Sequence, residues 1–287
     1  MLALLALLAC SPDDTGTDAA LVPDAVETEP FTGRPVAEPV GACPVFDAPG
    51  TQDLEAGGVD RQIEAYWPVN HEGPIGLVYA WHGLGDRADN FAAAFDAERV
   101  AKVNDVVVVV PWSQNPDLLT WAIVGDGGAD LALFEQVRNC AAQRFELDES
   151  RVWSTGFSFG ALWTTYLTLH ASDVLAGTAI FSGGTGESIG MPYFAPAYPI
   201  PVLAAWGGDR DAFDAGVLRV EFAATTADLT DGLEADGHTV VRCDHGLGHT
   251  VPFEWEEIVG KFLLTSRFGE PSPYADGDTS DLPDYCF

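Results

Sequence analysis

One ten-residue stretch, Val152 to Ala161 (VWSTGFSFGA), constrains the fold of this chain more than any other segment. It begins as a β-rich run, passes through the pattern G-x-S-x-G around Ser158, and continues into the helix-like residues 162–170. Strand, glycine-framed serine and helix follow one another in a nucleophile elbow, where the serine lies on a strained turn above a sheet. Gly156 and Gly160 lack the Cβ atoms that would clash in so tight a turn. The stretch therefore predicts an exposed Ser158 hydroxyl.

Strand-like and helix-like segments alternate along most of the chain. Strands are predicted at 61–67, 75–81, 106–110, 152–155, 176–181, 202–206 and 239–243. Helices are predicted at 90–101, 130–145, 162–170, 215–235 and 253–268. This alternation predicts an α/β fold, with a mostly parallel sheet covered by helices on both faces.

A serine hydroxyl is a weak nucleophile at neutral pH, so Ser158 needs a base within hydrogen-bond reach and an acid that orients this base. On an open α/β sheet such groups lie in loops at the carboxyl ends of strands. The loop GGDRD follows the predicted strand 202–206. Its Gly-x-x-Asp spacing favours Asp211 as the acid, with Asp209 as the alternative.

The base is expected after the last predicted strand, where the loop holds two histidines, His245 and His249. Glycines crowd His249, and Pro252 then begins the final helix. Because glycines give a loop unusual conformational freedom, this loop can turn an imidazole back toward the elbow. We therefore prefer His249 as the base and keep His245 as the alternative.

Acyl transfer also needs donors aimed at the developing oxyanion. The amide of Phe159, at the start of the helix after Ser158, is one candidate. The loop HGLGD follows the strand 75–81, and the amide of Leu84 is the second candidate. Trp112 and Trp121 lie in a loop-like region, and we expect them to bind substrate in an apolar acyl pocket.

Four motifs together resemble the α/β-hydrolases, and more narrowly the bacterial esterases that include polyhydroxybutyrate depolymerases and feruloyl or acetylxylan esterases. They are WHGLGD at 81–86, ESRVWSTGFSFGA at 149–161, WGGDRD at 206–211 and GLGHTVP at 246–252.

The resemblance implies a triad of Ser158, Asp211 and His249, with Leu84 and Phe159 as oxyanion amides. It also implies that no metal or organic cofactor is needed. At two positions the chain departs from the pattern of many members, which have a polar residue at Phe159 and a glycine at Ala161.

The two ends of the chain are predicted to lie outside the catalytic domain, 43–269. Residues 1–10 are an apolar run that ends in LLAC, which resembles a lipoprotein signal with Cys10 as the lipidated residue, although no Lys or Arg precedes it. Residues 11–42 are rich in Pro, Asp and Thr and predict a disordered acidic tether, and 270–287 predict an acidic tail held through Cys286. We therefore expect an exported protein that is anchored to a membrane by lipid or is extracellular.

Charge and cysteine content agree with export. The net charge is −31 over 287 residues, which repels nucleic acid and excludes it as a partner. Besides Cys10 the chain has four cysteines, and an even number in an exported chain predicts disulfides, here two of unspecified pairing. The four cysteines are Cys43, Cys140, Cys243 and Cys286.

These observations predict a secreted serine esterase that hydrolyses carboxylic esters, polymeric ones included, through an acyl-enzyme. The expected esters are of the polyhydroxyalkanoate type or of the feruloyl and acetyl-xylan type. Two alternatives remain: an acyltransferase with the same triad, and a surface lipoprotein that has the fold without catalysis.

Overall fold

The computed structural model describes residues 33–114, 120–216 and 219–287. The predicted signal 1–10 with Cys10, and residues 11–32 of the predicted tether, lie outside the described residues. From residue 33 onward the described chain belongs to one compact unit.

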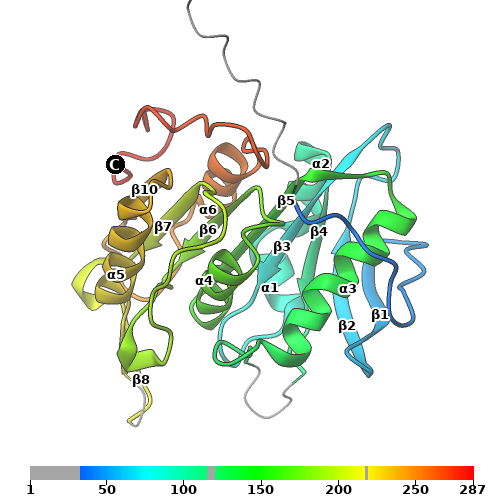
Figure 1. Cartoon of the computed structure of the whole chain (residues 1–287), viewed down its shortest axis with the longest axis horizontal. Helices are drawn as coiled ribbons and strands as arrows, with labels where there is room; N and C mark the ends of the chain where they lie inside the picture. The colour runs from blue at the N-terminus through cyan, green and yellow to red at the C-terminus, as the bar shows by residue number, and fades with distance from the viewer. Residues whose placement is uncertain (1–32, 115–119, 217–218) are drawn as a thin grey trace, which may run out of the picture. The chain divides into compact units, whose positions relative to one another are not determined.

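A sheet of eight strands forms the centre of the molecule, in the order β1-β2-β4-β3-β5-β6-β7-β10 (Figure 1). Strands β4, β3, β5, β6, β7 and β10 are parallel, whereas β1 and β2 form an antiparallel edge next to β4. The strands are β1 (Gly50–Ala56), β2 (Val59–Tyr66), β3 (Ile75–Trp81), β4 (Val106–Pro111), β5 (Leu147–Phe157), β6 (Gly177–Phe181), β7 (Val202–Trp206) and β10 (Val240–Asp244). The predicted fold class is confirmed. The sequence did not predict β1, whose outward positions are polar.

Helices cover both faces of the sheet. One face is packed by α3 (Gly128–Arg144), α4 (Phe159–His170) and α5 (Phe222–Ala235). The other face is packed by α1 (Ala88–Ala94), α2 (Ala97–Asn104), α6 (Trp255–Ile258) and the π-helical segment Val259–Leu263. The continuous apolar runs IGLVYAW and VVVVVP form β3 and β4, both buried over their whole length because helices lie above and below them. No helix within the described ranges is long and apolar enough to cross a bilayer.

Two predicted helices are shorter in the structure. The helix expected over 215–235 begins only at Phe222, because a small hairpin of β8 (Ala212–Asp214) and β9 (Arg219–Glu221) precedes it. The helix expected over 253–268 spans only α6 and the π-helical segment. Short 3₁₀ helices at Glu187–Ile189 and Gly208–Arg210 complete the described elements.

Both predicted domain boundaries are wrong, because the flanking segments pack onto the domain. Residues 33–42 run along α3, where the backbone N–H of Ala37 donates to Asn139 and that of Val40 donates to Gln136. The C-terminal residues 285–287 pair with β10 through backbone hydrogen bonds, and Tyr274 and Leu282 are buried. The C-terminal segment is therefore part of the domain and is not held by Cys286 alone.

Two disulfides tie these flanking segments to the core. Cys43 is bonded to Cys140 in α3, and Cys243 in β10 is bonded to Cys286. The prediction of two disulfides is confirmed, and the structure supplies their pairing.

Candidate active site

Ser158 lies at the sharp turn between β5 and α4, near the middle of the sheet. Its backbone angles are φ 55° and ψ −120°, a conformation that costs free energy for a residue with a side chain. A Cβ atom at Gly160 would lie 2.0 Å from the carbonyl oxygen of Trp81, and one at Gly156 would lie 2.4 Å from the carbonyl oxygen of Gly160. The two glycines are therefore a steric requirement of this turn, as the motif predicts.

Three predicted side chains meet at this turn. Ser158 Oγ lies 2.9 Å from Nε2 of His249, and Nδ1 of His249 lies 2.7 Å from Oδ1 of Asp211. Ser158 follows β5, Asp211 follows β7, and His249 lies in the loop after β10. The carboxyl ends of these parallel strands share one edge of the sheet, and this brings together residues that are far apart in the sequence.

The carboxylate of Asp211 is fully buried and uses both oxygens. Oδ1 faces His249, while Oδ2 accepts hydrogen bonds from the Ser182 hydroxyl and the Gly207 amide, both at 2.8 Å. Ser182, the residue after β6, has φ 58° and is completely buried. The sequence analysis missed Ser182, and no local motif marks it.

Two aromatic rings enclose the imidazole of His249. The ring of Phe222 is stacked on it at 4.7 Å with an interplanar angle of 8°, and the ring of Phe157 lies 4.9 Å away on a tilt of 30°. Phe222 is the first residue of α5, and its N–H donates to the carbonyl of Asp211. The start of α5 therefore contributes to the position of both the imidazole and the acid.

The candidate oxyanion residues Leu84 and Phe159 both line a pocket that opens at Ser158 and His249. Phe159 is the first residue of α4, so its N–H has no acceptor within the helix. Leu84 belongs to the loop after β3, which is supported from below by Trp121, whose Nε1 donates to the carbonyl of His82 at 2.9 Å. Both residues therefore lie at the pocket of the serine hydroxyl, and the oxyanion role of their amides stays a prediction.

The pocket at Ser158, here called the Ser158 pocket, has a volume of about 250 Å³. Its wall is largely apolar and includes Phe159, Leu162, Phe213, Val220 and Phe222. Phe213 and Val220 come from the β8–β9 hairpin, and Val220 falls within the helix that was predicted over 215–235.

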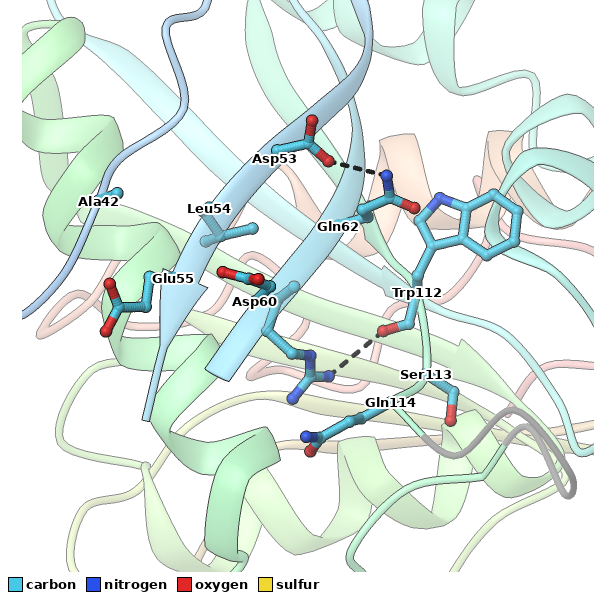
Figure 2. A pocket seen from close by; sticks show the side chains of 10 residues that line it. Ala42, Asp53, Leu54, Glu55, Asp60, Gln62, Trp112, Ser113 and Gln114 are labelled. Carbon is cyan, nitrogen blue, oxygen red and sulfur yellow. Dashed lines mark hydrogen bonds between the residues drawn. The ribbon is translucent and has the colours of Figure 1, made fainter. Parts of the chain in front are cut away.

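Neither predicted tryptophan lines the Ser158 pocket, so the prediction of an acyl pocket built from them is wrong. Trp121 is buried and packs edge-on against Trp81 at 5.0 Å, as a core residue below the loop. Trp112 lines a different cavity, over the outer face of β1 and β2 (Figure 2). Both tryptophans follow β4 in the sequence, and the sequence alone does not show whether such a residue packs in the core or lines a pocket.

The alternatives to Asp211 and His249 lie elsewhere. Asp209 is exposed on a 3₁₀ turn. The ring of His245 accepts a hydrogen bond from the amide of Leu247, and burial lowers the pKa of His245 below the ordinary value.

Burial likewise lowers the pKa of the buried His82 on the Leu84 loop, which favours the neutral form of this histidine. Across the described residues, no cluster of three or more His, Cys, Asp or Glu side chains is arranged to hold a metal ion.

The sheet order and the elbow are those of the α/β-hydrolase fold. No family model matches the sequence. The chain is 27% identical to feruloyl esterase B of Thermothelomyces thermophilus over 238 residues, which cover 75% of this chain and 78% of that protein. It is also 26% identical over 195 residues to the oxidized polyvinyl alcohol hydrolase of a Sphingopyxis strain, covering 56% of this chain and 54% of the relative.

Solved structures agree on the fold. Native pOPH superposes with a TM-score of 0.65 at 19% identity, covering 85% of this chain and 95% of that one. Acetyl xylan esterase from Aspergillus awamori superposes with a TM-score of 0.57 at 14% identity, covering 73% of this chain and 97% of that one. The chain thus has the α/β-hydrolase fold, and its sequence is similar to that of a feruloyl esterase over most of its length.

Proposed function

We propose that this protein is a secreted serine esterase that hydrolyses carboxylic esters through an acyl-enzyme. Ester hydrolysis as such agrees with the feruloyl esterase relative. One observation carries the mechanism: the hydroxyl of Ser158, the imidazole of His249 and the carboxylate of Asp211 form a continuous hydrogen-bonded chain at 2.9 and 2.7 Å, at the floor of an apolar pocket.

In the first half of the proposed reaction, Ser158 Oγ attacks the ester carbonyl carbon while Nε2 of His249 takes the hydroxyl proton. Asp211 holds the Nδ1–H tautomer and stabilises the imidazolium that forms. The amides of Leu84 and Phe159 would donate to the oxyanion, a contribution of about 3 kcal/mol for one such donor. The imidazolium then protonates the leaving alcohol as the carbon–oxygen bond breaks.

In the second half, His249 takes a proton from water, and the hydroxide attacks the acyl carbon. Ser158 leaves with a proton returned by His249, and the carboxylic acid is released. Each step uses groups of the chain itself, so the proposal includes no metal or organic cofactor.

We place the natural esters in the feruloyl and acetyl-xylan type first, because feruloyl esterase B is among the relatives and the Ser158 pocket is apolar. Polyhydroxyalkanoate esters are the alternative. Two disulfides support an oxidising location outside the cytoplasm. Anchoring through Cys10 is part of the proposal and rests on the sequence of residues 7–10.

The test is hydrolysis of p-nitrophenyl acetate and butyrate by the purified chain and by Ser158→Ala. We expect Ser158→Ala to lose at least about 10³-fold in kcat. A fluorophosphonate probe should label the parent at Ser158 and leave the variant unlabelled. Equal rates in parent and variant would overturn the proposal, and transfer to an added alcohol in place of water would favour the acyltransferase.

The substrate is then sought with methyl ferulate, acetylated xylan and polyhydroxybutyrate film. Release of ferulate or acetate at a higher kcat/KM than release of hydroxybutyrate supports the assignment. A higher kcat/KM for the release of hydroxybutyrate would instead assign the protein to the esterases that hydrolyse polyhydroxyalkanoates.

A further inference from the structure

A second cavity, here called the Trp112 cavity, lies on the antiparallel edge of the sheet and has a volume of about 670 Å³. Its walls include Asp53, Glu55, Asp60, Gln62, Trp112 and Gln114 (Figure 2). This volume lies within the range of about 300–1,000 Å³ that is typical of organic-ligand sites.

The Trp112 cavity adjoins the Ser158 pocket through one loop. Asp86 of this loop lines the Ser158 pocket, and the next residue, Arg87, lies over the indole of Trp112 at 4.9 Å. Trp112 directly follows β4, which is separated from β5 only by β3. The two pockets therefore lie on the same carboxyl edge of the sheet, separated by the Asp86–Arg87 loop and Trp112.

Four polar side chains project from the outer face of β1 and β2. Asp53 is directly opposite Gln62 in the register, and Glu55 is directly opposite Asp60. Gln62 Nε2 donates to Asp53 at 2.7 Å, whereas within the described chain neither Glu55 nor Asp60 makes an ion pair. Like charges directly opposite on neighbouring strands are destabilising. External hydrogen-bond donors between the strands would relieve this repulsion.

Trp112 is held as a rigid wall of the cavity. Its Nε1 donates to Glu64 at 3.0 Å, and its backbone N–H donates to the carbonyl of Gln62 at 3.0 Å. Arg87 lies over one face of the indole, so a ligand that stacks on Trp112 would have to use the opposite face. Figure 2 shows the Gln62 carboxamide between Asp53 and this indole.

The chemistry of these walls selects the ligand. Carboxylates only accept hydrogen bonds, so they pair with ligands rich in hydroxyl donors. A polyester has carbonyl acceptors and no donors along its chain, so the three carboxylates cannot bind it. The Arg61 guanidinium also lines the cavity but is paired with Asp130, so the three carboxylates dominate the charge and repel an anionic polymer. The indole face is electron-rich and favours the C–H face of a sugar ring over a flexible aliphatic chain.

From these observations we propose that the Trp112 cavity is a subsite for a neutral polysaccharide, which would hold the sugar chain of an ester bound at Ser158. The placement of the scissile ester rests on the proposed esterase function, whereas sugar binding itself does not. Glu55 and Asp60 accept hydrogen bonds from sugar hydroxyls, and Trp112 stacks on one ring. The subsite thus lies on the alcohol side of the substrate.

The test measures binding without turnover. The full chain carrying Ser158→Ala is titrated with xylohexaose by calorimetry. The same titration is made with double variants that carry Ser158→Ala together with Trp112→Ala, Trp112→Phe or Asp60→Asn. We expect Trp112→Ala to weaken binding about tenfold and Trp112→Phe to restore most of it, because the aromatic face carries the contact. Asp60→Asn should weaken binding about threefold, while Asp47→Asn, an exposed carboxylate outside the cavity, should have no effect.

Several outcomes would overturn the subsite. They are no binding of xylohexaose, equal binding by Trp112→Ala and its parent, and tighter binding of polyvinyl alcohol, of hydroxybutyrate oligomers or of Ca²⁺ at the same residues. Since Asp60 is exposed, Asp60→Asn gives a readout even where Trp112→Ala fails to fold. If xylohexaose binds but the unmodified chain does not hydrolyse p-nitrophenyl esters, the esterase proposal fails and the subsite proposal stands.

Discussion

At the scale of single residues, Asp211 is the part of the site that makes it more than a contact between a serine and a histidine, because it gives the geometry of a triad. It is buried, both of its oxygens are used, and the imidazole it faces is enclosed by two aromatic rings. The spacing in GGDRD predicted this acid. The sequence could not predict Ser182, because this serine comes from a different strand and meets Asp211 only when β6 and β7 pair.

Replacing Asp211 by Asn is expected to reduce kcat on p-nitrophenyl butyrate by about 10⁴-fold, because an amide stabilises the wrong imidazole tautomer. The fold should persist, since Asn has nearly the same shape as Asp. Asp209→Asn is the matched control, because the side chain of Asp209 is exposed, and this variant should keep its activity within about twofold. A large loss in Asp209→Asn with little loss in Asp211→Asn would reverse the assignment.

Ser182→Ala is expected to reduce kcat about tenfold with little change in KM, because Asp211 loses one of its two supporting donors. Ser182→Gly relieves the positive φ of 58° at this position but also lacks the hydroxyl, so it should lose the rate to a similar extent. A purely structural role would instead lower the melting temperature and leave kcat per folded molecule unchanged. Steady-state kinetics together with thermal unfolding separate the two.

At the scale of elements, the elbow was predictable and the pocket wall was not. A tight turn between strand and helix permits only glycine at certain positions, so its pattern is visible in the chain itself. The β8–β9 hairpin, in contrast, pairs only Ala212–Asp214 with Arg219–Glu221, which is too short for a strand pattern to stand out in the sequence. Its sequence therefore resembled the start of the helix that follows.

Gly160→Ala is expected to lower the free energy of unfolding by about 3 kcal/mol or more, because its methyl group would lie 2.0 Å from the Trp81 carbonyl oxygen. Gly260→Ala is the matched control, since a Cβ there meets only Asn104 at 3.7 Å. Its effect should stay within about 1 kcal/mol. Guanidinium unfolding of both variants measures the difference, and similar stabilities would contradict the strained elbow.

At the scale of the whole molecule, the two disulfides close loops with sequence separations of 97 and 43 residues. Replacing either pair by serines is expected to cost about 2–5 kcal/mol of unfolding free energy. The Cys43–Cys140 pair joins the N-terminal segment to α3, away from the triad, so its removal should leave kcat unchanged at 25 °C. Denaturant unfolding with and without reductant measures the cost, and unchanged stability on reduction would contradict it.

Stability is also expected to fall as the pH drops below the ordinary histidine pKa of 6.5. Burial lowers the pKa of four histidines, His82, His170, His238 and His245. The unfolded chain then binds more protons than the folded chain, so the contribution is fully present above pH 6.5 and decreases below it. Unfolding at pH 7.5 and 5.5 tests this above the range in which carboxyl groups titrate, and equal stability at both would contradict it.

What the sequence determined by itself was local: the elbow, the strand–helix alternation and the choice of Ser158, Asp211 and His249, the three side chains that meet at the elbow. These depend on sterics and on chain order, which neighbouring residues encode. The tertiary structure decided which distant groups share one place, namely the Ser182 bond to Asp211, the rings around His249, the disulfide pairing and the separation of Trp112 from Trp121. Such contacts follow from which strands pair and from what each helix covers, and no short segment of the chain contains that information.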